Sequence, residues 1–278
     1  MSQHDSDMRR LPRKPLVDAV SRVLVRQGMF AADAGVSAER LFDLLAVGVD
    51  GIEWFGGLIK KIELGEIDPR GQLVQEEKTG DSGVVFDAGP LFPPAALTKV
   101  CKAIERSAAT TGSAAAIVSM RNRFGPASPF DLLPYCSLIT DSRFIGWASS
   151  LAGEVDDPPT LFTLRRTDDE LVAVDLQRFD IDTSNLPHLA IESLVRMLDD
   201  IGLEDVYAAR QEDDSAPSVL LAALPKSEFS ALAEALEDCE SKVIPAEDDP
   251  IPMNDFRRTS LRSMLSSHGV QLDEFFDG

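Results

Sequence analysis

Residues 83–120 read GVVFDAGPLFPPAALTKVCKAIERSAATTGSAAAIVSM. The run at 83–89 is short, apolar and closed by Gly-Pro, which is typical of a strand. Pro93 and Pro94 then open a helical segment that continues to Gly112, and proline is well placed at the start of a helix. The apolar run at 114–120 predicts a second strand. A strand, a helix and a strand in this order indicate an α/β or α+β protein.

The same alternation continues on both sides of this stretch. The sequence predicts a mixed sheet flanked by helices, of class α/β (α+β). Helices are predicted at 13–27, 34–48, 52–64, 129–140, 187–201, 229–236 and 254–267. Strands or extended segments are predicted at 144–150, 161–165, 171–175, 205–210, 218–224 and 241–252. No internal repeat is present.

A chain of 278 residues is long enough for one large domain or two modest ones. The polar residues 1–12 are expected to be a disordered lead. Residues 13–152 form the predicted helical and α/β part. The stretch GEVDDPPT at 153–160 is the best linker candidate. It opens an acidic α/β part at 153–278, whose C-terminal helix is expected to pack back on the rest.

The charge is strongly asymmetric. Residues 1–150 hold 17 basic and 18 acidic side chains, whereas residues 151–278 hold 10 and 29, which accounts for −19 of the total charge of −20. Such a surface repels nucleic acid and anionic membranes, and it gives no site for a phosphate-rich cofactor. Its two explanations are a solvated face that aids solubility and a docking surface for a basic partner.

Targeting segments are not evident in the sequence. No apolar run approaches the roughly 20 residues that span a bilayer, and the polar N-terminus lacks the apolar stretch of a signal peptide. A cytoplasmic location is therefore expected.

Metal and phosphate chemistry find no support in the motifs. The cysteines are widely spaced and form no Cys-x-x-Cys pair, so they are expected to be packing residues; they are Cys101, Cys136 and Cys239. Neither Gly-x-Gly-x-x-Gly after a strand nor the phosphate-loop motif occurs. The three histidines, His4, His188 and His268, show no metal-ligand spacing. His268 lies in Ser-Ser-His-Gly at 266–269, where Gly269 is expected to follow the end of a helix and His268 to sit on its last turn.

Five stretches, taken in order, resemble the malate/L-lactate dehydrogenase family that does not use a Rossmann domain, which includes ureidoglycolate and sulfolactate dehydrogenases. Residues 23–51 are similar to its opening helices, 58–71 to its next helix and turn, and 84–89 to its strand ending in Asp-Ala or Asp-Gly. Residues 103–130 resemble the helix, strand and loop of its second site segment, and 242–274 resemble its C-terminal tail. The resemblance implies the family's fold, with a reduced middle domain, and its dimeric assembly.

The departures from the family pattern concern the catalytic groups. The family has Ser-His-Gly after its second helix, and that histidine serves as acid or base during hydride transfer to or from nicotinamide. Here the place reads Asp50-Gly51-Ile52-Glu53. The family's second histidine precedes Phe-Gly, where this chain has Arg123. The family's Gly-Thr-Asn-Pro and late Gly-Gly-x-Lys-Gly cofactor segments have no counterpart, and the missing length falls between about 153 and 217.

The resemblance brings the segments 49–55 and 121–128 together. A residual pocket there would contain Asp50, Glu53, Arg121 and Arg123. Burial could raise the pKa of Glu53 enough to make it a proton donor, and the arginines could clamp a small carboxylate. Alternatively, Glu53 is a solvated residue at a helix start, and the arginines are surface or ion-paired residues.

Three functional interpretations follow. The first is a catalytically degenerate, dehydrogenase-like pseudoenzyme without cofactor, which acts as a binding, scaffolding or partner protein. The second is a reductase or dehydrogenase of small 2-oxo, 2-hydroxy or cyclic imino acids that uses NAD or NADP with replaced catalytic groups. The third is a subunit that needs another chain to complete its site. A homodimer is expected, with Trp54 and Phe55 of the helix 52–64 as candidate contact residues; their burial within one chain is the alternative.

Overall fold

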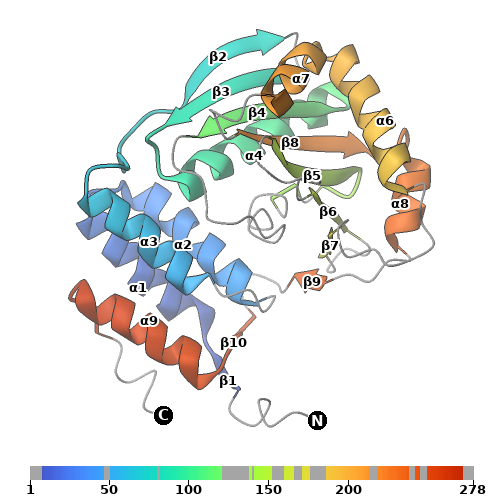
Figure 1. The fold of residues 1–278 in the computed structure, drawn as a ribbon. Coiled ribbons are helices and arrows are strands. Elements are labelled where there is room, and N and C mark those ends of the chain that lie inside the picture. The colour runs from blue at the N-terminus through green and yellow to red at the C-terminus, as the bar shows by residue number, and fades with distance from the viewer. Residues whose placement is uncertain are drawn as a thin grey trace. The chain divides into compact units, whose positions relative to one another are not determined.

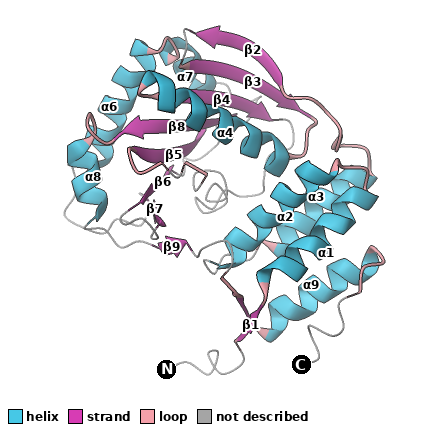
Figure 2. Cartoon of the chain, turned by 180° about the vertical axis from the view of Figure 1, so that it is seen from behind, coloured by secondary structure: helices cyan, strands magenta, loops and turns pink. Residues whose placement is uncertain are grey.

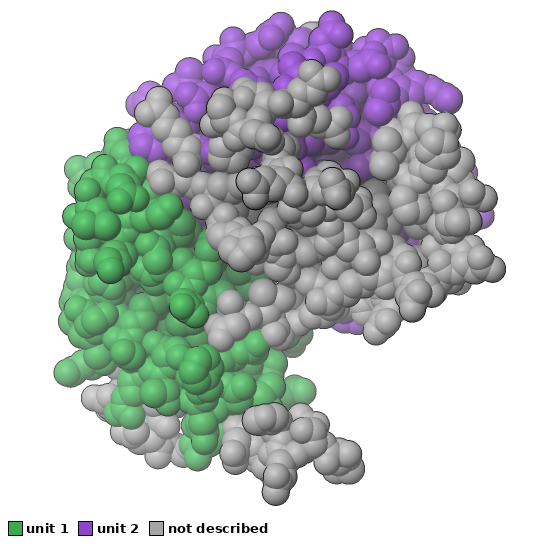
Figure 3. Space-filling view, viewed as in Figure 1, with its two compact units in different colours: residues 1–71, 245–278 green, residues 72–244 purple. Residues whose placement is uncertain are grey.

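The computed structural model describes residues 8–46, 51–79, 82–120, 138–139, 141–151, 160–165, 171–175, 186–212, 218–237, 242–244 and 249–271. The chain forms two compact units, one of residues 1–71 and 245–278 and the other of residues 72–244 (Figure 3). The first unit joins the two ends of the chain. Among the described residues, no helix is long and apolar enough to cross a membrane.

The first unit is helical. Its helices are α1 (Arg13–Arg26), α2 (Ala31–Ala46), α3 (Ile52–Glu63) and α9 (Asp255–Ser267). Helix α9 contacts α1 and α3 (Figure 1). Two short strands, β1 (Arg9–Leu11) and β10 (Ile251–Met253), pair in antiparallel fashion. This pairing holds the C-terminal segment against the start of the chain.

Apolar residues at helical spacing explain why these helices pack. On α1, Leu16, Val20 and Val23 lie on one face and are fully buried. Helix α3 buries Ile52, Phe55, Leu58, Ile59 and Ile62 in the same way. Gly28 lies in the turn between α1 and α2 with a φ of 97°, a backbone conformation that glycine adopts without steric cost.

The second unit is built on a mixed eight-stranded sheet. Its strands are β2 (Val74–Thr79), β3 (Gly83–Gly89), β4 (Ala114–Met120), β5 (Phe144–Leu151), β6 (Thr160–Arg165), β7 (Leu171–Asp175), β8 (Ser218–Pro225) and β9 (Lys242–Ile244). Their order across the sheet is β2-β3-β4-β8-β5-β6-β7-β9. Strands β3 and β4 are parallel, and the other neighbouring pairs are antiparallel.

Helices cover both faces of this sheet. Helix α4 (Pro93–Thr111) connects β3 to β4 and contacts β4 and β8 on one face. Helices α6 (Leu186–Asp200), α7 (Glu204–Glu212) and α8 (Ser230–Glu237) lie on the other face (Figure 2). There Leu194, Leu198 and Tyr207 share a core with Ile117 and Trp147 of the sheet. The predicted class, a mixed sheet flanked by helices, is confirmed.

Most predicted elements of the described residues are present. Strands β3 and β4 have the predicted bounds, and the helices differ from the prediction by a few residues at their ends. The predicted helix at 129–140 falls almost entirely outside the described residues, and so does the linker at 153–160.

Two predictions of local structure were wrong. Residues 205–210 were predicted to be a strand but form most of α7. The run contains only two large apolar residues, Val206 and Tyr207, and the following alanines favour a helix once Gly202 and Leu203 have ended α6. Residues 9–11 were placed in a disordered lead but form β1, because β10 supplies a partner strand from the far end of the chain.

The boundaries of the two compact units differ from the predicted division at 152/153. Strands β5 and β6 lie on either side of that position and pair in one sheet, Ile145 opposite Leu164 through Ser149 opposite Thr160. Composition and charge change near residue 153, but hydrogen bonding between neighbouring strands continues across the change. A sheet of this kind takes its strands from distant parts of the chain, so a linker-like composition need not mark a boundary.

Candidate functional site

The predicted residual pocket is only partly within the described residues. Asp50, Arg121 and Arg123 lie outside them. Glu53 lies in the first turn of α3 with an exposed side chain. There a negative charge is favoured by the positive end of the helix dipole. The exposure fits the interpretation of Glu53 as a solvated residue at a helix start, and the pocket of four charged residues stays a prediction.

The two aromatic residues of α3 have different surroundings. Phe55 is fully buried within the chain, and Trp54 is partly buried. Their rings meet edge to face with centroids 5.9 Å apart. Phe55 is thus a residue of the helical core, and only Trp54 retains surface that a second chain could contact.

His268 caps a helix, as the sequence predicts. It follows the last residue of α9, and Gly269 has a φ of 72°. Arg26 of α1 donates a hydrogen bond to the backbone carbonyl of His268 over 2.7 Å. The His268 Nδ1 lies 3.4 Å from the Glu63 carboxylate of α3. These contacts join the end of α9 to α1 and α3, so the role of His268 in the structure is to connect three helices.

The helical unit contains a buried cluster of charged side chains. Arg13 of α1 donates to the carboxylate of Asp43 on α2, and Arg40 pairs with the other oxygen of the same carboxylate at 3.2 Å. All three residues are buried: Arg13 is 5% exposed, Asp43 6% and Arg40 8%. Glu39 also pairs with Arg40 at 3.2 Å. The formal charges of these four residues sum to zero, and their contacts link α1 to α2.

Polar residues gather where β3, β4 and β8 meet. Asp87, Ser119 and Ser218 occupy one row across the three strands. The Ser119 and Ser218 hydroxyl groups are buried and 3.3 Å apart, and the Asp87 carboxylate accepts a hydrogen bond from the Gly89 N–H over 2.6 Å. In open α/β sheets, ligands bind beyond the carboxyl ends of parallel strands. The row lies at the carboxyl ends of β3 and β4, so it is a candidate for ligand contacts that the motifs did not reveal.

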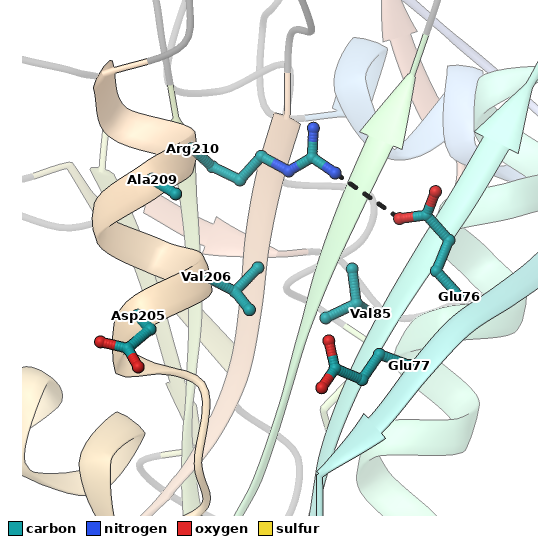
Figure 4. A pocket seen from close by; sticks show the side chains of 7 residues that line it. All are labelled: Glu76, Glu77, Val85, Asp205, Val206, Ala209 and Arg210. Atoms are coloured by element: carbon teal, nitrogen blue, oxygen red, sulfur yellow. Dashed lines mark ion pairs between the residues drawn. The ribbon is translucent and has the colours of Figure 1, made fainter.

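A pocket lies between α7 and the strands β2 and β3, on the face of the sheet that α7 covers (Figure 4). Its volume is about 430 Å³. Val85, Val206 and Ala209 provide apolar surface, and Glu76, Glu77, Asp205 and Arg210 surround it. Arg210 of α7 reaches toward β2, and its guanidinium lies 3.5 Å from the Glu76 carboxylate. The four charged side chains carry a formal net charge of −2.

An irregularity in β2 directs two glutamates into this pocket. The register against β3 shifts between Gln75 and Glu77, so Glu76 is an extra residue on its strand. Consecutive side chains of a regular strand point to opposite faces, whereas a bulge redirects a side chain. Both Glu76 and Glu77 consequently line the same pocket. This site was not predicted, because residues 74–79 carry no strand signal in the sequence and residues 205–210 were predicted to be a strand.

Comparison with solved structures gives close agreement in fold over nearly the whole chain. A malate dehydrogenase from Pyrococcus horikoshii OT3 matches with a TM-score of 0.64 and 14% identity, covering 98% of this chain and 99% of its own. A sulfolactate dehydrogenase from Methanocaldococcus jannaschii matches with a TM-score of 0.61 and 14% identity, covering 96% and 99%. The chain has the malate/L-lactate dehydrogenase fold.

A third solved structure of similar fold is a reductase. It is the delta1-piperideine-2-carboxylate reductase from Pseudomonas syringae pvar. tomato, with a TM-score of 0.52 and 16% identity, covering 96% of this chain and 97% of its own. No protein-family model and no curated protein matches the sequence. Similarity at these identities establishes the malate/L-lactate dehydrogenase fold. It does not establish the activity, because one fold can host different functions.

The pocket of Figure 4 does not suit a nicotinamide dinucleotide. The diphosphate of that cofactor is anionic and would meet Glu76, Glu77 and Asp205, while Arg210, the cation among the described lining residues, pairs with Glu76. No group of three or more histidine, cysteine or acidic side chains within the described ranges could hold a metal ion. Cys101 is buried, as predicted for a packing residue; Cys136 and Cys239 lie outside the described residues.

Proposed function

We propose that the chain keeps the malate/L-lactate dehydrogenase fold without nicotinamide chemistry, and that it works as a binding or partner protein. The observation that carries this proposal is the replacement of both histidines that the family resemblance expects. Asp50-Gly51 stands in place of the first and Arg123 in place of the second. Hydride transfer to a ketone or imine needs a proton donor near the receiving atom, and neither position supplies the expected one.

The absence of cofactor motifs in the sequence supports the same proposal. The sequence has no counterpart of the family's Gly-Thr-Asn-Pro or Gly-Gly-x-Lys-Gly segments. The acidic side chains of residues 151–278 add an unfavourable field for a dinucleotide. Without a bound hydride carrier, the remaining charged groups have no redox partner.

A residual pocket with Asp50, Glu53, Arg121 and Arg123 is part of the proposal. Arginine recognises carboxylates through paired hydrogen bonds, so a small carboxylic acid is the ligand class that Arg121 and Arg123 would take. The alternative for these residues is charge pairing within the chain that needs no ligand. We also propose a homodimer, in which the exposed part of Trp54 contributes to the contact.

The second candidate function is an NAD- or NADP-dependent reductase of small 2-oxo, 2-hydroxy or cyclic imino acids. The names of the solved structures favour it, because each compared protein is a dehydrogenase or a reductase. In that case Glu53 is the candidate proton donor in place of histidine. Its side chain is exposed on α3, where it is open to solvent and not enclosed around a substrate.

A turnover assay separates the two functions. The chain is incubated with NADH or NADPH and a panel of 2-oxo acids that includes pyruvate, oxaloacetate and delta1-piperideine-2-carboxylate, and absorbance of the reduced cofactor is followed. We expect no oxidation above the enzyme-free rate, because the proton donor and the carrier site are both missing. A rate that saturates with substrate and disappears on heating the protein would support the reductase instead.

A further inference from the structure

Strand β2 is an edge of the main sheet. It stands at one end of the strand order and, among the described residues, pairs only with β3 (Figure 1). Residues 74–78 are exposed, and Thr79 is half-buried. An edge strand presents a row of backbone N–H and C=O groups to which another extended segment can bind. Addition of a peptide strand to such an edge is a common mode of recognition.

The side chains of β2 restrict what can pair with it. Its sequence is Val-Gln-Glu-Glu-Lys-Thr, with two adjacent glutamates in the middle. An antiparallel second copy of β2 would bring these glutamates close to their equivalents, and like charges on paired strands destabilise pairing. A basic strand would instead place positive side chains beside the glutamates. The edge therefore discriminates against the chain itself and favours a basic partner.

The adjoining pocket matches one kind of side chain. Val85, Val206 and Ala209 form its apolar surface, and Glu77 and Asp205 have no ion-pair partner within the described part of the chain. A lysine can lay its methylene groups along an apolar surface while its ammonium remains near carboxylates. Glu76 is held by Arg210 at 3.5 Å. Glu77 and Asp205 are left to receive an incoming ammonium.

We propose that β2 and this pocket form a docking site for an extended, lysine-bearing segment of a basic protein partner. The segment adds to the outer edge of β2 as a further strand, and one of its lysines enters the pocket beside Glu77 and Asp205. A residue directly opposite another on a neighbouring strand has its Cβ about 5 Å away, within reach of a lysine side chain. The proposal rests on the proposed function, since it supplies the class of partner that a non-catalytic chain would bind.

The charge of the whole chain agrees with this partner. Residues 151–278 carry a formal charge of −19, and α7 with Asp205 and Arg210 belongs to them. Complementary charge steers association and accelerates encounter. The same field opposes nucleic acid, so a basic protein segment is the occupant that the edge, the pocket and the overall charge favour together.

The test uses the full-length chain and a fluorescently labelled peptide, Lys-Val-Thr-Val-Lys-Val-Thr-Val-Lys, with anisotropy as the readout. Two control peptides change one property each: glutamate replaces every lysine in the first, and proline replaces the central valines in the second, which keeps the charge but cannot form a full ladder. The variant Glu76→Lys/Glu77→Lys is compared with Glu228→Lys/Glu234→Lys. The latter makes the same change in charge at exposed positions that do not line the pocket. Thermal melting confirms that each variant is folded.

We expect the lysine peptide to bind and both control peptides to bind at least about tenfold more weakly. We also expect Glu76→Lys/Glu77→Lys to weaken binding about tenfold or more, and the control variant to change it by less than about threefold at about 150 mM salt. Equal binding of the proline peptide would show attraction by charge alone and overturn strand addition. Absence of binding at about 1 mM protein, or equal losses in both variants, would overturn the docking site.

Three further outcomes separate this proposal from its alternatives. A dimer that dissociates in Glu76→Lys/Glu77→Lys, measured by sedimentation without peptide, would assign the edge to a second copy and overturn the proposal. Binding of NADH by a chain that also binds the lysine peptide would contradict the proposed function and leave the docking site supported. Failure of peptide binding together with no NADH binding would overturn the docking site alone.

Discussion

Asp43→Ala should lower the free energy of unfolding of the helical unit by about 3–5 kcal/mol. Asp43 is the carboxylate shared by Arg13 and Arg40, and all three side chains are at least nine-tenths buried. Its removal leaves two guanidinium groups in a poorly solvated position without the carboxylate that both of them contact. The cost is mainly the loss of compensation for these buried charges, and a smaller part is the lost contact itself.

The two tryptophans of the chain allow this loss to be measured in one unit. Trp54 lies in the helical unit and Trp147 in the sheet unit. In a Trp147→Phe background, Trp54 fluorescence during urea unfolding reports on the helical unit. The control Asp18→Ala removes an exposed carboxylate from α1 and should change the free energy of unfolding by less than about 0.5 kcal/mol. A loss below about 1 kcal/mol for Asp43→Ala would contradict the description of a buried, mutually dependent cluster.

Trp147→Ala should destabilise the sheet unit by about 3–5 kcal/mol. Trp147 is only 2% exposed and is the largest of the fully buried side chains. It lies on β5 in the middle of the sheet, in the core that also contains residues of α6, α7 and α8. Truncation removes apolar surface from the core and leaves a cavity that rigid strands on both sides cannot close.

Unfolding of Trp147→Ala is followed by circular dichroism, because the substitution removes the fluorescent reporter. Trp147→Phe preserves most of the buried ring and should lose less than half as much stability. The exposed Val74→Ala serves as a surface control, since the Val74 side chain is 55% exposed. Equal stability of Trp147→Ala and Val74→Ala would show that the core does not depend on this residue.

The sequence predicted the elements whose signals are local. The bounds of β3 followed from an apolar run closed by Gly-Pro, and those of β4 from the apolar run at 114–120. The start of α4 followed from Pro93 and Pro94, which lie in its first turn. Strands β1 and β2 carry no such signal. Their residues are mostly polar, and each is a strand because a partner strand supplies its hydrogen bonds.

The candidate sites depended even more on contacts between distant segments. Nothing in the spacing of Arg13 and Asp43 indicates that they meet, because their contact depends on how α1 and α2 pack. The pocket at Glu76 and Glu77 requires a shift of register in β2 and the correct assignment of α7 as a helix. Conversely, the family resemblance of five short stretches predicted the fold. The solved structures confirm this fold over nearly the whole chain.

The chain has the malate/L-lactate dehydrogenase fold, and we propose that it lacks a working nicotinamide site. Calorimetric titration of NADH and of NADPH into the full-length protein tests it most directly, because binding of the carrier precedes any choice of substrate. We predict no saturable heat and a dissociation constant weaker than about 100 μM, which corresponds to about −5.5 kcal/mol. Saturable binding of either cofactor below about 100 μM would contradict the claim.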